Sequence, residues 1–345
     1  MKSINLLNKT LLENKRVLLR GDLDCPLENG KIVDSSRLDS IRDTLDYLVR
    51  RACKVVLVGH LGRPDGMQVD ALRAKPVADY LKSVGYDVRV SQSILGPDAY
   101  ESLKQLQNGQ ILLLENLRFD KREEENSEAF AKELSAFGDL YVNDCFSSSH
   151  RNHASFCAIT KFLPSYAGLR LDKEVESLAR VVSNPEKPLV AIFGGIKLET
   201  KLPAISKFLS IADYVLLGGR LGLSYEGDNN YKVLVPVDYA GDSEDIGPKT
   251  ISMFQNIIRM AKTVIWNGPM GKIEHHEFLT GTREIAECIV GSKAFSVVGG
   301  GDTILALDKL NLRDKMGFVS MGGGAMLEFI EGKRLPGLVS LSYYN

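Results

Sequence analysis

Cysteine, tryptophan and long apolar runs are scarce in this sequence of 345 residues, and neither sign of charge is in excess. The 5 cysteines are scattered without a C-x-x-C pair, so a zinc site or a disulfide framework is not expected. Free thiols are typical of a cytoplasmic protein. The first residues contain no signal-peptide pattern, and no apolar run reaches the roughly 18 residues that a membrane span needs. We therefore expect a cytoplasmic protein that has no membrane partner.

The charge balance argues against a nucleic-acid partner. Lys and Arg number 43 and Asp and Glu 44, whereas a nucleic-acid-binding surface normally needs a basic excess. This balance does not exclude a local cationic pocket. The length predicts about two domains, and 44% hydrophobic with 25% charged residues is typical of a globular chain. We expect a monomer.

Short, continuous apolar runs alternate with helical patterns along the whole chain. Continuous runs are typical of strands buried on both faces of a parallel sheet. They span residues 16–20, 55–58, 87–90, 111–114 and 140–142, then 189–193, 214–217, 232–235, 263–266, 295–298 and 317–320. Residues 38–51 and 127–137 space their apolar side chains three or four apart, as amphipathic helices do. The alternation predicts an α/β fold of two Rossmann-like domains with parallel sheets.

A hinge helix is predicted to join the two domains. Residues 172–182 have a helical pattern, and Pro164, Gly168, Pro185 and Pro188 stand on either side of it. We expect a first domain over residues 1–165, completed by residues 331–345. An interdomain helix then covers 166–187, and a second domain covers 188–330.

Cationic side chains follow the predicted strands of the first half, and one more, Arg37, stands at the start of the first predicted helix. They are Arg37, His60, Arg63, Arg118, His150 and Arg151. Ligands of open parallel sheets bind beyond the carboxyl ends of the strands, and arginine suits carboxylate and phosphate groups. The pattern predicts a site for a small anion, where Asp22 and Asp24 orient the cations or accept hydroxyl hydrogen bonds. Residues 121–125 (KREEE) predict a solvated helix start.

Glycines follow the predicted strands of the second half. They stand at positions 194–195, 218–219, 268, 271, 299–301 and 322–324. Glycine lets backbone N–H groups approach a phosphate at a helix N-terminus, so these positions predict a nucleotide-binding surface. The sequence has no G-x-x-x-x-G-K-[ST] motif, and no G-x-G-x-x-G follows the first strand of either half. A P-loop enzyme and a nicotinamide dehydrogenase are therefore not favoured. An anion domain hinged to a nucleotide domain predicts phosphoryl transfer by domain closure.

Eight segments together resemble the phosphoglycerate kinase family. In chain order they are RGDLDCPLENGKIVDSSR, GHLGRP, LLLENLRF, YVNDCFSSSHRNHAS, GGIKLETK, WNGPMGKIE, GGGDT and SMGGGAMLEFIEGK. The resemblance implies reversible phosphoryl transfer between 1,3-bisphosphoglycerate plus ADP and 3-phosphoglycerate plus ATP, with Mg²⁺, in glycolysis or gluconeogenesis.

The resemblance also implies a role for individual residues. It places 3-phosphoglycerate at Asp22, Leu23, Asp24, Arg37, His60, Leu61, Gly62, Arg63, Arg118 and Arg151 in the first domain. It places the nucleotide at Gly194, Gly195, Lys197, Lys201, Asn267, Glu274, Gly300, Gly301, Asp302, Thr303, Gly322, Gly323 and Gly324. Arg37 and Lys197 would act on the transferring phosphoryl group, Glu274 would hold the ribose, and Asp302 would serve the Mg²⁺–nucleotide.

The sequence is shorter than is usual in this family, mainly in the predicted nucleotide domain, so we expect a compact member; it also departs from the family at Asp24. Arg220 stands where a third glycine is expected after Gly219, and the excursion at 239–245 is short; both segments usually wall the adenine pocket. Asp24 replaces an asparagine, and its protonation or a hydrogen bond to a nearby arginine would have to offset the added charge. A catalytically impaired phosphoglycerate-kinase-like binding protein is the alternative function. A different sugar-acid kinase would rest on Asp24 alone.

Overall fold

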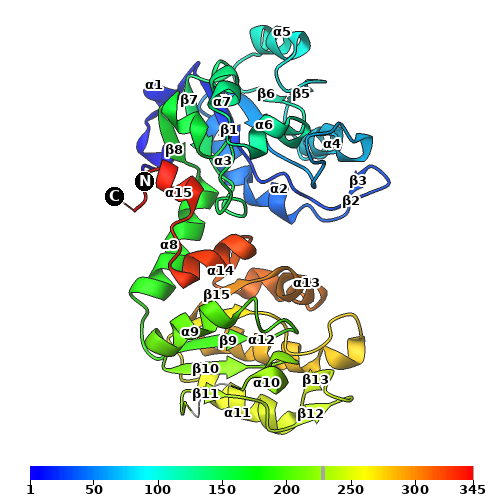
Figure 1. Ribbon diagram of the computed structural model, residues 1–345, viewed down its shortest axis with the longest axis vertical. Helices are drawn as coiled ribbons and strands as arrows, with labels where there is room; N and C mark the ends of the chain where they lie inside the picture. The colour runs from blue at the N-terminus through cyan, green and yellow to red at the C-terminus, as the bar shows by residue number, and fades with distance from the viewer. Residues whose placement is uncertain (227–229, 345) are drawn as a thin grey trace. The chain divides into compact units, whose positions relative to one another are not determined.

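The computed structural model describes residues 1–226 and 230–344 and divides the chain into two compact units (Figure 1). The first unit contains Met1–Lys173 and Arg334–Asn345, and the second contains Glu174–Lys333. Each unit has its own six-stranded sheet, in which every strand pairing is parallel. The predicted α/β class with two parallel sheets is confirmed.

The first sheet has the strand order β5-β6-β4-β1-β7-β8. Its strands are β1 (Arg16–Arg20), β4 (Lys54–Val58), β5 (Val88–Val90), β6 (Ile111–Leu113), β7 (Leu140–Asn143) and β8 (Ser165–Ala167). Alternate residues of β1 belong to different apolar clusters. Val17 and Leu19 belong to one cluster, and Leu18 belongs to the other. Because successive side chains of a strand point to opposite faces, this sheet is covered on both sides, as the continuous apolar runs predicted.

Short helices and one hairpin complete the first unit. They are α1 (Lys9–Leu12), α2 (Ser36–Ser40), α3 (Arg42–Val49), α4 (Lys75–Ser83), α5 (Pro97–Gln105), α6 (Lys121–Glu124), α7 (Glu128–Ser135), α15 (Pro336–Ser340), and the hairpin β2 (Leu27–Glu28) and β3 (Lys31–Ile32). The helix predicted at residues 38–51 is two helices that meet at Ile41. The C-terminal segment packs on the loop after β7, where Gly337 N–H donates to the Ser149 carbonyl at 2.9 Å.

The second sheet has the strand order β11-β10-β9-β14-β15-β16. Its strands are β9 (Leu189–Phe193), β10 (Tyr214–Leu217), β11 (Val233–Leu234), β14 (Thr263–Asn267), β15 (Phe295–Gly299) and β16 (Phe318–Ser320). The helices are α9 (Leu202–Ile211), α10 (Leu221–Ser224), α11 (Pro248–Ile258), α12 (Thr280–Ser292), α13 (Gly301–Lys309) and α14 (Gly324–Glu331). The short excursion at 239–245 contains the antiparallel hairpin β12 (Tyr239–Ala240) and β13 (Asp245–Ile246).

Helix α8 (Leu169–Ser183) contains the boundary between the two units. Its first turn is anchored by Asp144, whose Oδ1 accepts hydrogen bonds from the backbone N–H groups of Arg170 at 2.9 Å and Leu171 at 3.0 Å. Gly168 precedes the helix because a Cβ there would lie only 2.2 Å from Asp144 Oδ1. Over the described residues, no helix has the length and apolar character to span a bilayer.

Candidate functional site

In the first unit, charged residues gather at the carboxyl edge of the sheet. Asp22 and Asp24 follow β1, His60 and Arg63 follow β4, and Arg118 follows β6 in a 3-10 turn (Leu117–Phe119). Arg151 follows β7. Because these four strands are parallel neighbours, their carboxyl ends share one edge, which confirms the predicted placement.

Asp22 orients Arg37 at the start of this edge. Nη1 of Arg37 lies 3.0 Å from each carboxylate oxygen of Asp22, whose side chain is only 5% exposed. The Asp22 charge outweighs burial and raises the pKa of Arg37, so this guanidinium keeps its charge. The prediction that Asp22 orients a cation is confirmed.

Asp24 and Arg20 flank the buried imidazole of His60. Nη2 of Arg20 lies 2.8 Å from Nδ1 of His60, and Nε2 of His60 lies 3.6 Å from Asp24 Oδ2. A guanidinium can only donate, so His60 Nδ1 accepts and Nε2 carries the proton toward Asp24. Burial, with the charges of Arg20 and Arg118, lowers the pKa of His60 to about 4.

The extra carboxylate of Asp24 stays ionised. Burial opposes its charge, but the nearby His60 imidazole and a hydrogen bond from the Gly62 amide at 2.8 Å hold the pKa of Asp24 below its usual value. Arg37 adds a favourable charge interaction. The charge is thus offset chiefly by an imidazole and a backbone amide, rather than by protonation or an arginine hydrogen bond.

Two fully buried charged residues behind His60 were not anticipated. Nε of Arg20 donates to Ser155 Oγ at 3.0 Å, and Ser155 Oγ donates to Glu123 Oε1 at 2.5 Å. Arg20 and Glu123 are both 0% exposed. The expectation that residues 121–125 form a solvated helix start is wrong for Glu123. The only signal for Arg20 was a charge that ends an apolar strand.

The remaining cations differ in exposure. Arg118 is 7% exposed and donates to the Gly62 carbonyl at 2.8 Å, while its Nε lies 3.2 Å from Glu124. Arg63 and Arg151 are exposed, and neither has an ion pair within residues 1–226 and 230–344. Leu23 and Leu61 are buried at the same edge. This edge therefore combines fixed inner charges with two free outer guanidiniums.

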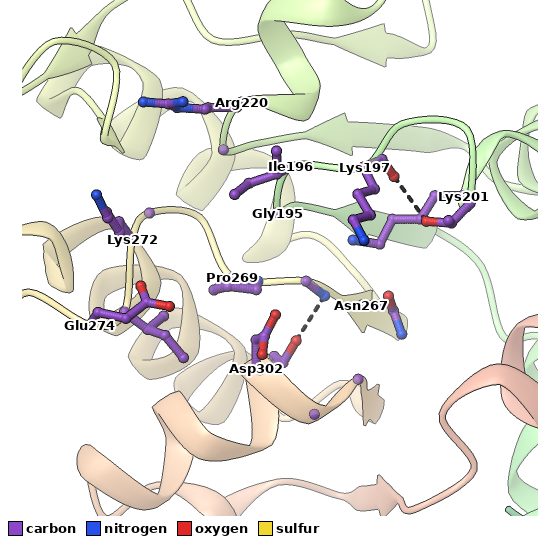
Figure 2. Close-up of a pocket in the computed structure, with 18 of the residues that line it drawn as sticks. Gly195, Ile196, Lys197, Lys201, Arg220, Asn267, Pro269, Lys272, Glu274 and Asp302 are labelled. Atoms are coloured by element: carbon purple, nitrogen blue, oxygen red, sulfur yellow. Dashed lines mark hydrogen bonds between the residues drawn. The ribbon is translucent and has the colours of Figure 1, made fainter. Parts of the chain in front are cut away.

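In the second unit, a pocket of about 410 Å³ opens at the carboxyl edge of the sheet (Figure 2). Nine of the thirteen predicted nucleotide-site residues line it: Gly195, Lys197, Lys201, Asn267, Glu274, Gly300, Gly301, Asp302 and Thr303. Gly194 lies just behind the wall, where a Cβ would sit 2.2 Å from the Pro269 carbonyl. Gly322, Gly323 and Gly324 do not line the pocket; they lie between β16 and the start of α14.

Lys197 and Lys201 stand at one end of this pocket (Figure 2). Nζ of Lys201 donates to the Gly194 carbonyl at 2.5 Å, and burial lowers its pKa although Asp302 opposes the shift. Lys197 is exposed, and its backbone carbonyl accepts a hydrogen bond from Thr200 Oγ1 at 3.0 Å. This end can bind an anionic group.

The N-terminus of α13 faces the same pocket. Gly300 caps the helix with φ +98°, which an L side chain rarely adopts, and a Cβ there would lie 3.1 Å from Asn267 Nδ2. Thr303 Oγ1 accepts a hydrogen bond from Gly268 N–H at 2.8 Å and ties this turn to the loop after β14. Free N–H groups and the helix dipole favour phosphate at such a terminus.

Charged residues also occupy the other end of the pocket. Arg220, Lys272 and Glu274 lie there, on the side opposite Lys197 and Lys201 (Figure 2). Glu244 belongs to the same lining and pairs with Arg220 and Lys272. Neither Lys272 nor Glu244 was predicted from the sequence: Lys272 stands within the WNGPMGKIE segment but was given no role, and Glu244 lies outside the glycine segments.

Within the described ranges, no group of three or more His, Cys, Asp or Glu side chains could hold a metal ion alone. Asp302 is the predicted metal-serving carboxylate, and it lines the pocket with Lys201. A single carboxylate fits Mg²⁺ that is bound mainly through phosphate oxygens and water.

The fold and these two carboxyl-edge sites define a two-unit α/β protein with an anion-binding edge and a phosphate-type pocket. A family model described as "Phosphoglycerate kinase" matches residues 7–236 and 228–333. The chain belongs to the phosphoglycerate kinase family.

Individual relatives agree over nearly the whole chain. Phosphoglycerate kinase of Finegoldia magna is 39% identical over 379 residues, covering 95% of this chain and 96% of the relative. That of Borreliella burgdorferi is 36% identical, covering 94% and 95%. The solved phosphoglycerate kinase structure from Coxiella burnetii has a TM-score of 0.84 at 34% identity and covers 99% of both chains. The Pyrococcus horikoshii structure has a TM-score of 0.87 at 30% identity, covering 99% of this chain and 98% of the other.

The comparisons also bear on length. The alignment to the Finegoldia magna protein extends over 379 positions, more than the 345 residues of this chain. That relative therefore contains segments that this chain lacks, which confirms the prediction of a compact member.

Proposed function

We propose that this protein is an active phosphoglycerate kinase, a phosphotransferase with a carboxyl group as acceptor. It would transfer a phosphoryl group reversibly between 1,3-bisphosphoglycerate plus ADP and 3-phosphoglycerate plus ATP. The observation that carries the proposal is the pocket in which Lys197, Lys201 and Asp302 meet the N-terminus of α13. No observation favours the catalytically impaired alternative.

The edge of the first unit is proposed to bind 3-phosphoglycerate. Arg63 and Arg151 are free to form bidentate contacts with a phosphate or carboxylate, as arginine geometry favours. His60 is held neutral, with Nδ1 occupied by Arg20. Asp24 can accept a hydrogen bond from the substrate hydroxyl.

The pocket of the second unit is proposed to bind the nucleotide. Lys197, Lys201 and the backbone of Gly300 and Gly301 would contact the phosphates, and Glu274 would accept hydrogen bonds from the ribose. Gly322, Gly323 and Gly324 stay predictions for the phosphate contacts. Asp302 would be the carboxylate that holds the Mg²⁺ of the nucleotide, and this ion would neutralise part of the phosphate charge.

The chemistry needs charge stabilisation rather than a base. The acceptor is a carboxylate that is already ionised at neutral pH, so no proton has to be removed. Phosphoryl transfer instead depends on positioning and on cations near the transferring group, and we assign Lys197 and Arg37 to that role. Asp22 would keep the Arg37 guanidinium charged and oriented.

The test is a coupled assay with 3-phosphoglycerate and Mg-ATP. Wild type should turn over, and Lys197→Ala should lower kcat by about 10²–10³, as loss of one preorganised transition-state contact does. Lys262→Met is the matched control, since Lys262 is exposed at the opposite end of β14 from the pocket. Absence of turnover by wild type would refute the proposal.

A further inference from the structure

Three charged residues lie at the end of the pocket opposite Lys197 and Lys201, and the proposed phosphate contacts give them no role. Nη2 of Arg220 donates to Glu244 Oε1, and Lys272 Nζ lies 3.6 Å from Glu244 Oε2. We call Arg220, Glu244 and Lys272 the distal trio. Figure 2 shows two of its members, Arg220 and Lys272, far from Lys197 and Lys201 across the pocket.

Backbone contacts hold the distal trio in place. Lys272 N–H donates to the Glu244 carbonyl at 2.8 Å, so the two residues are joined directly. The buried carboxylate of Asp245 accepts a hydrogen bond from Gly281 N–H at 2.7 Å and anchors the β12–β13 hairpin. On the other side, Leu221 N–H donates to the Gly195 carbonyl at 3.0 Å and fixes the chain next to Arg220. The backbone of the distal trio is thus preorganised for a ligand.

The side chains of the distal trio stay accessible. Those of Arg220, Glu244 and Lys272 are 49%, 20% and 44% exposed. Ion pairs of this exposure contribute little to stability, so stability gives no reason for three charges at the end of a pocket. Two cations share one carboxylate, which leaves one positive charge at this end of the pocket and N–H donors of Arg220 and Lys272 beyond those that contact Glu244.

A nucleotide with its phosphates at Lys197, Lys201 and α13 would direct its base toward the opposite end. Guanine presents two acceptors there, O6 and N7, which Arg and Lys contact best. Adenine has an amino group in place of O6, and this donor would face the donors of Arg220 and Lys272. Guanine also carries N1–H and an N2 amino group, which a carboxylate such as Glu244 can accept.

We propose that the distal trio reads the base and makes this pocket prefer guanine over adenine nucleotides. The proposal rests on the proposed function only in taking the pocket as the nucleotide site. In the bound state, Arg220 and Lys272 donate to O6 and N7, while Glu244 keeps one cation and accepts from N1–H and N2–H. The phosphate end does not discriminate between bases.

Calorimetric titration of the full chain with Mg-GDP and with Mg-ADP tests the preference directly. GDP should bind about tenfold more tightly or better, which is the discrimination of one good bidentate contact. Mg-IDP, which has O6 but lacks the N2 amino group, should fall between the two. Arg220→Ala/Lys272→Met should bring the ratio of GDP to ADP affinity close to one, whereas Lys262→Met should leave it unchanged.

The outcomes separate this inference from the proposed function. Equal affinity for GDP and ADP, binding of neither, or a preference that survives Arg220→Ala/Lys272→Met would overturn the base assignment. Guanine preference without turnover of any nucleoside triphosphate would support the distal trio and refute the kinase. Equal turnover of GTP and ATP, with equal affinities, would support the kinase and refute the distal trio.

Discussion

The two carboxyl-edge sites of this protein are built in opposite ways. In the first unit, Arg20, His60 and Arg118 are at most 7% exposed and are already held by neighbours. In the second unit, Lys197 and Arg220 are exposed, and glycine backbone forms much of the wall. One site is a buried polar network, and the other is an open pocket lined by exposed cations and N–H groups.

This difference indicates in which of the two sites the same side chains determine both ligand binding and folding stability. A buried charge that loses its partner is costly, so each member of the network in the first unit contributes to the free energy of unfolding of that unit. Exposed lysines contribute little to folding and can be tuned for a ligand alone. We therefore expect substitutions in the first site to change stability, and those in the second to change activity only.

Removal of Arg20 should have the largest effect. Arg20→Met would remove a fully buried cation that donates to Ser155 and His60 and attracts buried Glu123, and the free energy of unfolding should fall by about 3–5 kcal/mol. Urea denaturation followed by circular dichroism measures the change. Arg151→Met, an exposed arginine of the same edge, should change stability by less than about 0.5 kcal/mol. Equal losses in the two variants would break the contrast between the inner and outer charges.

Lys197 should show the opposite pattern. Lys197→Ala should lose about 3–4 kcal/mol of transition-state stabilisation, while its urea midpoint should match that of wild type, since the side chain is exposed. The measurement pairs kcat with denaturation of the same sample. A large stability loss would show that the second site is also part of a folding network.

Acid should weaken the first unit through its buried histidines. Burial, with the charge of nearby Arg118, lowers the pKa of His60 to about 4 and that of His153 to about 3. In the unfolded chain the histidines bind a proton near pH 6.5. The contribution of the neutral, buried histidines to the free energy of unfolding is therefore complete above that pH and is lost as the pH falls toward 4. Wild type should lose on the order of 1–3 kcal/mol more than His60→Gln between pH 7 and 4. Glutamine supplies an acceptor and a donor but cannot titrate, so parallel pH profiles would contradict the assignment.

The sequence predicted the fold well because apolar runs report burial directly. Each of the expected strands coincides with an observed one to within one residue at either end. The sequence analysis missed β8 (Ser165–Ala167), since a short strand of Ser, Tyr and Ala at the sheet edge has no apolar run. The first unit also contains the C-terminal segment Arg334–Asn345.

The site was less predictable wherever a charge is buried. The positions after the predicted strands identified His60, Arg63 and Arg118, because charged residues after apolar runs are visible in a sequence. It could not find Glu123, whose neighbours Arg122 and Glu124 look like a solvated helix face, because only tertiary packing buries it. Glu244 and Lys272 likewise meet only when the β12–β13 hairpin closes on the loop after β14.

Asp24→Asn should give the smallest effect and the sharpest view of the first site. Asp24 is ionised in wild type, so Asp24→Asn removes a negative charge beside the anionic substrate. This should lower KM for that substrate a few-fold, which corresponds to a repulsion of about 1 kcal/mol for a partly exposed charge. The free energy of unfolding should fall slightly. Both neighbours of the Asp24 carboxylate are donors, because Arg20 fixes the His60 proton on Nε2 and the Gly62 N–H needs an acceptor. In either orientation of the asparagine side chain, its amide nitrogen therefore faces one of these donors. Steady-state kinetics and thermal denaturation of one preparation resolve the two signs. A higher KM would show that Asp24 contributes to substrate binding as an acceptor more than it repels the anion.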